Sequence, residues 1–506
     1  MTRKNYSFST FSNNNCKRIR AAFQQLAICN LASSMEDSSA TTSFNYNKHL
    51  KEQFVSNLNG SSMLEIFSLA LVIPVIVLLR RAIGLNFVSV SHISQRLSKK
   101  DDIDSAKSKY SSAYMVTMTV DFLFIVIPVL LLHTVLSEWI FKLALLSTFF
   151  ILFCLLSKRY ITFSSSGSFQ PRDTVEKSIS SFRVVMMIIT CLCILAVDFN
   201  IFPRKYAKTE SYGTSWMDLG VGSFVVANAL VSRQARNVHS GGWKTALQST
   251  CPLILLGVAR LASTTGVDYQ VHVGEYGVHW NFFFTLAAVS LLTSAINIHP
   301  KYCGILGLFI LIGYQIVLVQ GLNTYLLSDV RGMDIVSQNK EGIFSIFGYL
   351  GMYLVGVQMG YELFFKNKYS ASSHRNQQTR RGVCAFAVIL WLLTLILNQH
   401  VEQASRRMCN MAYVMLVLAV NFEVLAIFML SEFTPGSNFT ALEGAFNQNL
   451  LASFLLANLL TGLVNLSVDT LFATSNEALA ILVLYAFVLC FFTGLANFYG
   501  FRLKFW

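Results

Sequence analysis

Charged residues are scarce in this chain, and their scarcity excludes an ordinary soluble protein. Only 13% of the 506 residues are Asp, Glu, Lys or Arg, while 54% are hydrophobic. Soluble proteins carry about 25% charged residues. The net charge of +13 does not indicate nucleic-acid binding, because the basic residues are scattered over loops. Anionic lipid headgroups are the simpler partner for them.

Common catalytic and cofactor motifs are also absent. The chain has no G-x-x-x-x-G-K-[ST] phosphate loop, no H-E-x-x-H zinc motif, no G-x-S-x-G nucleophile and no regular arginine series. Its ten cysteines lie mostly inside apolar runs, in a pattern that indicates neither a disulfide framework nor a metal site. We therefore expect no metal and no permanently bound cofactor.

Long apolar runs are abundant. A helix of about 20 mostly apolar residues spans a bilayer, and thirteen runs fit, near residues 64–82, 113–136, 138–157, 182–198, 216–232, 246–263, 281–298, 302–320, 343–365, 382–398, 408–430, 449–467 and 477–499. The fifth and sixth are the weakest, because polar residues and Arg260 interrupt them, so the count could be twelve. Lipid admits only helices or closed barrels. We predict an all-α, polytopic transmembrane helical bundle of about 13 membrane-spanning helices.

Positive charge gives the orientation of this bundle. Lys and Arg concentrate in the loops after the odd-numbered runs and in the C-terminal tail, and cytoplasmic loops retain such charge. We therefore expect a cytosolic C-terminus, an N-terminus on the opposite side, and a loop between runs four and five that faces away from the cytosol.

The N-terminal segment differs from the rest. Residues 1–34 contain Lys and Arg but no Asp or Glu, a composition that resembles a transit peptide or a leader. Met35 is then an alternative start, and a genuine disordered tail is the other interpretation. We expect a tail over residues 1–47 and one multi-pass domain over residues 48–506.

An unusual polar block follows the fourth run. Asp198 closes that run, Pro203 forces a turn, and Arg204, Lys205 and Lys208 follow. A turn of this size can bring Lys208 back towards Asp198, whose carboxylate could then stay ionised and take a proton from a hydroxyl. The simpler alternative is that Asp198 reaches the membrane surface while the basic trio binds headgroups.

The fifth run begins with a second acid. Asp218 could cap the helix that it opens, since acids suit a helix's first turn. Small residues after it, including Ser223, and the more distant Asn228 give this run a face against which a helix or an acyl chain could pack. Helix packing is the simpler interpretation.

Other polar residues lie on the same expected side of the membrane. His279 could act as a general base or simply form a structural hydrogen bond. Trp280 and Asn281 beside it are candidate substrate-binding residues, with an interfacial position as the alternative for Trp280. A second group has the positive and amide side chains that suit a phosphate, with headgroup contact as the alternative; it comprises Lys340, Arg406, Arg407 and Asn410. We add Asn465, in the twelfth run, to the candidate substrate-binding residues, which also include Arg204, Lys205, Asp218, Ser223 and Asn228.

Six stretches of the chain resemble the motifs of one known family. They are FVSNLNGSSMLEI (residues 54–66), LAVDFNIFPRKYAKTESYGTSWMDLGVGSFV (195–225), GVHWNFFFTLA (277–287), EGIFSIFGYLGMYL (341–354), SRRMCNMAYV (405–414) and TGLVNLS (461–467). They resemble, in order, the glucosaminyl-phosphatidylinositol inositol acyltransferases, the PIG-W family, whose fungal members are called GPI-anchored wall transfer proteins. The resemblance covers about residues 48–506.

The resemblance implies a function and its site. It implies a protein of the endoplasmic reticulum membrane that moves a fatty acyl group, palmitoyl or similar, from the co-substrate acyl-CoA to the inositol ring of glucosaminyl-phosphatidylinositol. The family's catalytic acid and lysine fall on Asp198 and Lys208, on the luminal side. The competing hypothesis from the residues alone is a secondary transporter or flippase of anionic lipids.

Overall fold

The structure is a computed structural model of the chain. It describes residues 54, 56, 58–84, 103–161, 171–238, 243–264, 273–365, 373–433 and 439–502, which belong to one compact unit, Gln53–Trp506. The predicted tail over residues 1–47 and the alternative start at Met35 lie outside the described residues.

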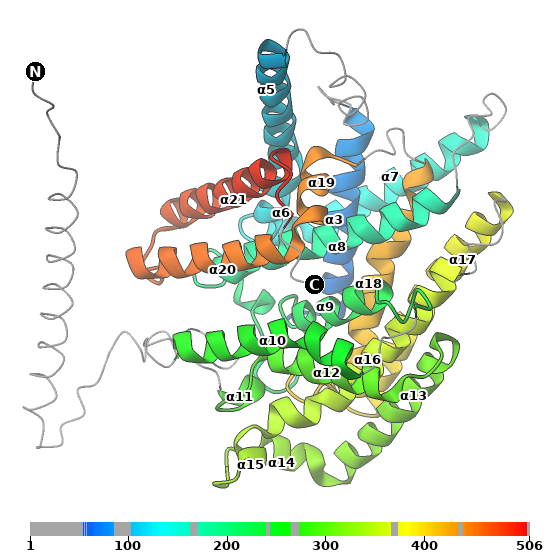
Figure 1. The fold of residues 1–506 in the computed structure, drawn as a ribbon, viewed down its shortest axis with the longest axis vertical. Helices are drawn as coiled ribbons and strands as arrows, with labels where there is room; N and C mark the ends of the chain where they lie inside the picture. Colours follow the sequence, from blue (N-terminus) through cyan, green and yellow to red (C-terminus); the bar gives the residue numbers. More distant parts are fainter. Residues whose placement is uncertain are drawn as a thin grey trace, which may run out of the picture. The chain divides into compact units, whose positions relative to one another are not determined.

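Helices account for the architecture (Figure 1). In the first half of the chain they are α3 (Met63–Ile83), α5 (Ile103–Asp121), η2 (Phe122–Val126), α6 (Ile127–Leu132), η3 (Ser137–Trp139), α7 (Ile140–Ile161), α8 (Pro171–Ala196), η4 (Arg204–Tyr206), α9 (Leu219–Leu230) and α10 (Trp243–Thr264). In the second half they are α11 (Val273–Tyr276), α12 (Phe282–Ile296), α13 (Pro300–Val317), η5 (Leu318–Leu322), α14 (Asn323–Leu327), α15 (Ile335–Gln338), α16 (Lys340–Phe365), α17 (Ser373–His400), α18 (Met411–Met429), η6 (Leu430–Phe433), α19 (Ala441–Gln448), α20 (Leu450–Ser467) and α21 (Ser475–Phe498).

The predicted class, a polytopic helical membrane protein, is confirmed. Among the described residues, 10 helices are long and apolar enough to cross a membrane, and three shorter apolar helices lie at Leu219–Leu230, Ala246–Ala262 and Phe282–Ile296. Each of the thirteen predicted runs thus coincides with a helix. The number of crossings, thirteen or fewer, stays a prediction, since two of the short helices are the runs that polar residues interrupt.

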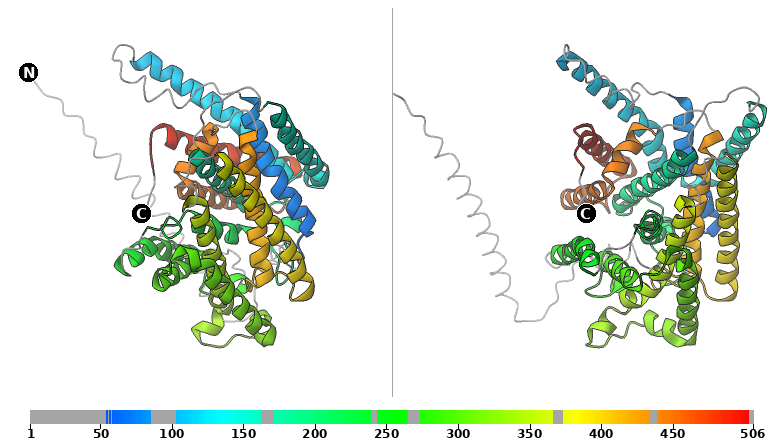
Figure 2. Two further views of the ribbon diagram at one scale, coloured as in Figure 1. Left: turned by 90° about the vertical axis from the view of Figure 1, so that its right-hand side faces the viewer. Right: turned by 45° about the vertical axis from the view of Figure 1, so that its right-hand side comes forward.

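Helix α18 forms the centre of the bundle. Its residues Ala412–Met429 are all buried, and it packs against α3, α8, α9 and α17, an arrangement that both views of Figure 2 allow the reader to follow. A helix that is apolar around its whole circumference is expected at such a position. Its one acid, Glu423, accepts a 3.0 Å hydrogen bond from the indole nitrogen of Trp391 on α17.

The outer helices expose apolar side chains. On α7, Leu146, Phe149 and Phe153 are 65%, 61% and 68% exposed. Water would make a surface of this kind costly, whereas lipid chains cover it at no such cost. The exposed faces of α7 and α17 therefore mark the lipid-facing side of the bundle.

Two buried arginines at the end of α3 join distant parts of the chain. Arg80 forms a 2.7 Å ion pair with Asp121, and both side chains are almost completely buried. Arg81 pairs with Glu443 of α19, a short helix that opens with a capping box formed by Thr440 and Glu443. The carboxylate of Asp121, which lies inside an apolar run, thus has a structural partner.

Loops that follow the even-numbered runs meet at one end of the bundle, which we call the Asp198 end. The backbone of Gly60 pairs with that of Thr214, Gly213 donates to the carbonyl of Ala404, and Asn200 donates to the carbonyl of Leu471. Gly60 has φ +81°, and a Cβ there would lie 2.2 Å from the Thr214 carbonyl oxygen, so this contact requires glycine. The predicted alternation of the loops agrees with these contacts, while the orientation in the membrane stays a prediction.

Candidate active site

The turn after α8 places Asp198 at the Asp198 end, partly exposed. Its Oδ2 accepts a 2.9 Å hydrogen bond from the Nδ2 amide of Asn465 on α20. An amide that donates to a carboxylate fixes its rotamer and favours its ionised form. The sequence named both residues separately, and the structure brings them together.

Arg204 closes this turn from within the chain. Its guanidinium donates to the carbonyls of Val197, Phe199 and Phe202 over 2.8–3.1 Å and lies 4.0 Å from the centre of the Phe54 ring. Burial lowers the pKa of Arg204 to about 10, although the charge of Asp198 acts in the opposite direction. A guanidinium at unpaired helix-end carbonyls stabilises that end, so Arg204 shapes the turn that carries Asp198.

Lys208 belongs to a four-membered ionic network. Its ammonium lies 2.7 Å from Oε1 of Glu275 on α11, and Arg406 binds the same oxygen at 2.8 Å. The Nε of Arg406 also pairs with Asp218 at 3.0 Å. Asp218 and Arg406 are buried, whereas the side chain of Lys208 is 43% exposed. The network therefore runs from a buried pair to an accessible ammonium.

The ionisation of the buried pair follows from its partners. Burial raises the pKa of Asp218, while Arg406 and the hydrogen bonds of Thr209 oppose that rise. Burial alone would lower the pKa of Arg406, yet Glu275 and Asp218 together raise it above its ordinary value. A charged arginine between two carboxylates is thus favoured.

One expectation about Asp218 is wrong. It precedes α9 at the capping position, but its side chain accepts no capping hydrogen bond. The carboxylate turns back instead, to the backbone nitrogen of Thr209 at 3.2 Å, to its hydroxyl at 2.7 Å, and to Arg406. Charge pairing with a residue of another loop outweighs the local cap.

The predicted approach of Lys208 to Asp198 stays a prediction. Asp198 contacts Asn465, and Lys208 contacts Glu275. Both residues lie in the one loop between α8 and α9, which the contacts of Thr209 and Thr214 fold against the bundle.

A second charged group lies beside the first. Glu341 accepts from Arg407 at 3.0 Å and from Arg331 at 2.7 and 3.0 Å. The Nε of Arg407 is buried and has no hydrogen-bond partner among the residues that the structure describes. Guanidinium groups are cations that bind phosphate oxygens well. This group of residues therefore favours an anionic ligand.

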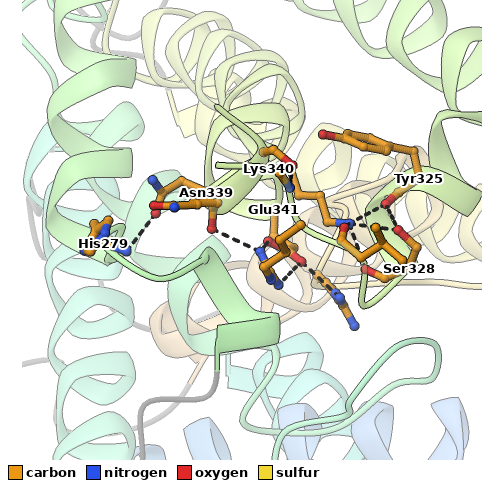
Figure 3. Close-up of polar contacts among 12 residues, drawn as sticks. His279, Tyr325, Ser328, Asn339, Lys340 and Glu341 are labelled. Atoms are coloured by element: carbon orange, nitrogen blue, oxygen red, sulfur yellow. Dashed lines mark hydrogen bonds and ion pairs between the residues drawn. The ribbon is translucent and has the colours of Figure 1, made fainter. Parts of the chain in front are cut away.

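Lys340 is held internally (Figure 3). Its ammonium donates to the carbonyls of Tyr325, Ser328 and Val330 at 2.7, 2.7 and 3.1 Å and to the Ser328 hydroxyl at 2.9 Å. It is fully buried. These contacts favour a structural role over the predicted contact with substrate.

The segment around His279 is organised by backbone contacts. The backbone nitrogen of His279 donates to Oδ1 of Asn339 at 2.7 Å (Figure 3), and its side chain is exposed. Trp280 donates from its indole to the Thr285 hydroxyl at 2.9 Å, and Asn281 caps α12. Trp280 and Asn281 therefore shape the loop, and His279 keeps an accessible imidazole.

The remaining predicted residues lie in separate places. Asn410 caps α18 and donates to Glu402 at 3.1 Å. Ser223 accepts from Asn421 at 3.0 Å inside the bundle. Lys205 pairs with Glu65 at 2.8 Å and Glu138 at 3.3 Å.

Asn228 lies apart from the charged cluster. It is on α9, ten residues beyond Asp218, which is about 15 Å along a helix. Its side chain is exposed. It therefore does not belong to the polar contacts at the Asp198 end.

Two acids that organise the site, Glu402 and Glu275, were not among the predicted site residues. Glu402 accepts from Tyr212, Gln315, Asn323 and Asn410 over 2.7–3.2 Å, and Glu275 joins Lys208 to Arg406. Acids are rare in this chain, and an acid that is partly buried in a membrane protein needs a partner. This rarity could have marked both residues as candidates.

Comparisons with known proteins agree along the whole domain. The GWT1 family model matches residues 47–496. An uncharacterised protein of Arabidopsis thaliana is 53% identical over 439 residues, which are 86% of this chain and 99% of that protein. GPI-anchored wall transfer protein 1 of Aspergillus oryzae is 37% identical over 510 residues, 89% of this chain and 97% of that protein.

A mammalian relative carries a biochemical name. Glucosaminyl-phosphatidylinositol-acyltransferase PIGW of Bos taurus is 33% identical over 524 residues, 91% of this chain and 99% of that protein. The family match and the full-length similarity together mean that this chain belongs to the GWT1 family, as the six motifs predicted.

Proposed function

We propose that the protein transfers a fatty acyl group from acyl-CoA to an inositol hydroxyl of glucosaminyl-phosphatidylinositol, a step of GPI-anchor synthesis. The observation that carries this proposal is the full-length similarity to a relative named as such an acyltransferase, combined with an accessible carboxylate at Asp198.

Asp198 acts as the general base in this proposal. An inositol hydroxyl loses its proton to the carboxylate while its oxygen bonds to the thioester carbonyl carbon. The carbon–sulfur bond then breaks, and the coenzyme leaves as a thiolate that takes up the proton held by Asp198, which restores the carboxylate. A positioned base contributes about 100- to 10,000-fold to such a step, and the bond from Asn465 holds Asp198 in place.

Lys208 supplies positive charge. Its ammonium is partly exposed and shares Glu275 with Arg406, so a negatively charged group can approach it without displacing the buried pair. It can stabilise the oxyanion that forms at the thioester carbon. Arg407, with its buried and unsatisfied Nε, is placed to bind the phosphate of the lipid acceptor.

Location follows from the same proposal. We place the protein in the endoplasmic reticulum membrane, with the Asp198 end luminal and the C-terminus cytosolic, as the charge distribution predicts. A glycosylation acceptor inserted after the exposed Glu210 of the same loop tests this orientation. An unmodified acceptor in a well-expressed fusion contradicts it.

A direct assay tests the reaction. Purified protein in lipid receives labelled palmitoyl-CoA and glucosaminyl-phosphatidylinositol, and acylated lipid is measured for the natural chain and for Asp198→Asn. We expect product only from the natural chain. A transporter or flippase leaves the inositol unacylated in both, and equal product from both contradicts Asp198 as the base.

A further inference from the structure

Helix α8 is buried except along one line. Between residues 181 and 198, the residues that are not buried are Arg183, Thr190, Ile194, Val197 and Asp198. Their spacings of seven, four and three residues repeat the helical period, so they share one face. An accessible line therefore runs from Arg183 to the candidate base.

Helix α9 has a matching line. Between residues 219 and 230, the residues that are not buried are Gly220, Val221, Phe224 and Asn228, which again follow the helical period. The Phe224 ring lies 5.6 Å from that of Phe454 on α20 and 6.0 Å from that of Phe282 on α12. In Figure 1, α9 lies between two pairs of helices: α8 and α20 are on one side of it, and α10 and α12 are on the other.

Two arginines lie at the far end of these lines. Arg183 is on α8 and Arg236 follows α9, two helices that contact each other, so both arginines lie at the end of this helix pair opposite the loop that carries Asp198. Arg236 lies over the Phe364 ring at 5.4 Å. Within the described part of the chain, neither guanidinium has a carboxylate within ion-pair distance. Arg183 is half-buried and Arg236 is exposed, so an anionic group can approach both guanidinium groups and form charge-assisted hydrogen bonds with them.

The distance between the two ends has a chemical meaning. Asp198 follows Arg183 by 15 residues, which is about 22 Å of helix. An acyl-CoA carries phosphates at one end of an extended pantetheine arm and the thioester at the other. The arm also contains amides, and the exposed amide of Asn228 lies between the two ends.

We propose that Arg183 and Arg236 bind the phosphates of the acyl-CoA donor, whose arm extends along the accessible lines of α8 and α9 and presents the thioester to Asp198. This inference rests on the proposed function. It implies that the donor and the acceptor approach from opposite ends of the bundle. The nucleotide of the donor lies at the Arg183 end, and the lipid acceptor lies at the Asp198 end.

Two donors separate this role from a structural one. Palmitoyl-CoA carries the phosphates, and S-palmitoyl-pantetheine does not. With the natural chain we expect a higher kcat/KM for palmitoyl-CoA. In the Arg183→Gln/Arg236→Gln double variant this preference falls at least tenfold through KM for palmitoyl-CoA, because charge-assisted hydrogen bonds are lost, while KM for the acceptor is unchanged.

One control and two further variants accompany the assay. Arg233→Gln removes an exposed charge of the same loop and leaves the preference unchanged. Asn228→Leu raises KM for both donors alike, since both contain the amides. Arg183→Lys/Arg236→Lys keeps the charge, retains part of the preference, and serves if the glutamine variant does not fold.

The outcomes that overturn the inference are distinct. Equal losses for the two donors show that the arginines act on structure or on lipid headgroups. An effect that appears only in vesicles containing anionic lipid, and disappears in pure phosphatidylcholine, assigns them to headgroups. If the natural chain transfers from neither donor, the proposed function itself fails; if it transfers from both with equal kcat/KM, only this inference fails.

Discussion

The amide of Asn465 and the carboxylate of Asp198 are joined by a 2.9 Å hydrogen bond across 267 residues of sequence. Helix α20 thus orients, through Asn465, the carboxylate of Asp198, which lies in the turn after α8. The relationship makes Asn465 a positioning residue for the proposed base.

Loss of this hydrogen bond should slow the reaction and shift its pH dependence. Asn465→Leu is expected to lower kcat about tenfold, because a bond to a charged group is lost. It should also raise the pKa of the base, since the amide favours the ionised form. The acidic limb of the kcat/KM profile then moves to higher pH. A profile that keeps its position at reduced kcat contradicts the positioning role.

Lys208→Ala should separate activity from stability. Its ion pair with Glu275 is partly exposed, and such pairs contribute about 0–1 kcal/mol. We expect turnover to fall at least 100-fold while the melting temperature in detergent stays nearly constant. Glu275→Gln is the comparison variant, because it removes the same pair and keeps the ammonium; since it also takes a carboxylate from the buried Arg406, its turnover is measured well below its own unfolding temperature. Equal losses in both variants would assign the effect to the pair itself.

Arg406→Gln should destabilise the fold. It leaves Asp218 buried without its cationic partner, and breaking such a pair costs about 3–5 kcal/mol. Adding Asp218→Asn should recover part of the loss, because no uncompensated charge remains. Thermal unfolding of the natural chain, both single variants and the double variant gives this cycle. Strict additivity of the two single effects contradicts the coupling.

His133 predicts a loss of stability in acid. The residue is buried, its Nδ1 lies 2.7 Å from the Val129 carbonyl oxygen, and its ring lies 5.9 Å from Trp216. Burial lowers the pKa of His133 to about 4 from 6.5. A lowered pKa means stability that is present above pH 6.5 and is lost as the pH falls towards 4.

Between pH 7 and pH 5 this residue alone should cost about 2 kcal/mol, at 1.36 kcal/mol for each pH unit below 6.5. His133→Phe keeps an aromatic ring and removes the titration. Its unfolding should therefore depend less on pH than that of the natural chain, as thermal scans at the two pH values can show. Parallel dependence in both proteins excludes His133 as the cause.

The sequence was most informative where one physical rule dominates. Each apolar run coincides with a helix because lipid admits few alternatives. Helix α19 was missed, since its eight residues have neither the length nor the apolar content of a span. The helices α8 and α17 also begin well before their apolar runs, at Pro171 and Ser373, because helical structure continues outside lipid.

Pairings between loops could not be predicted in the same way. Asp218 looked like a cap, because local geometry allows one, but its partner Arg406 lies 188 residues away. The approach of Lys208 to Asp198, expected from proximity in sequence, stays a prediction, while the ion pair of Lys208 with Glu275 was not predicted. Which loops meet depends on the packing of the helices between them, and single-sequence patterns do not encode that directly.

The ion pairs of Arg80 and Arg81 bear on how the chain is made. Both residues lie in the last turn of the first span and pair with Asp121 and Glu443, the second of which lies 362 residues later than Arg81. Until that part emerges from the ribosome, the two guanidinium groups can act as the positive flank that anchors the first span at one membrane surface. The same charges then first set topology during insertion and later close the finished bundle.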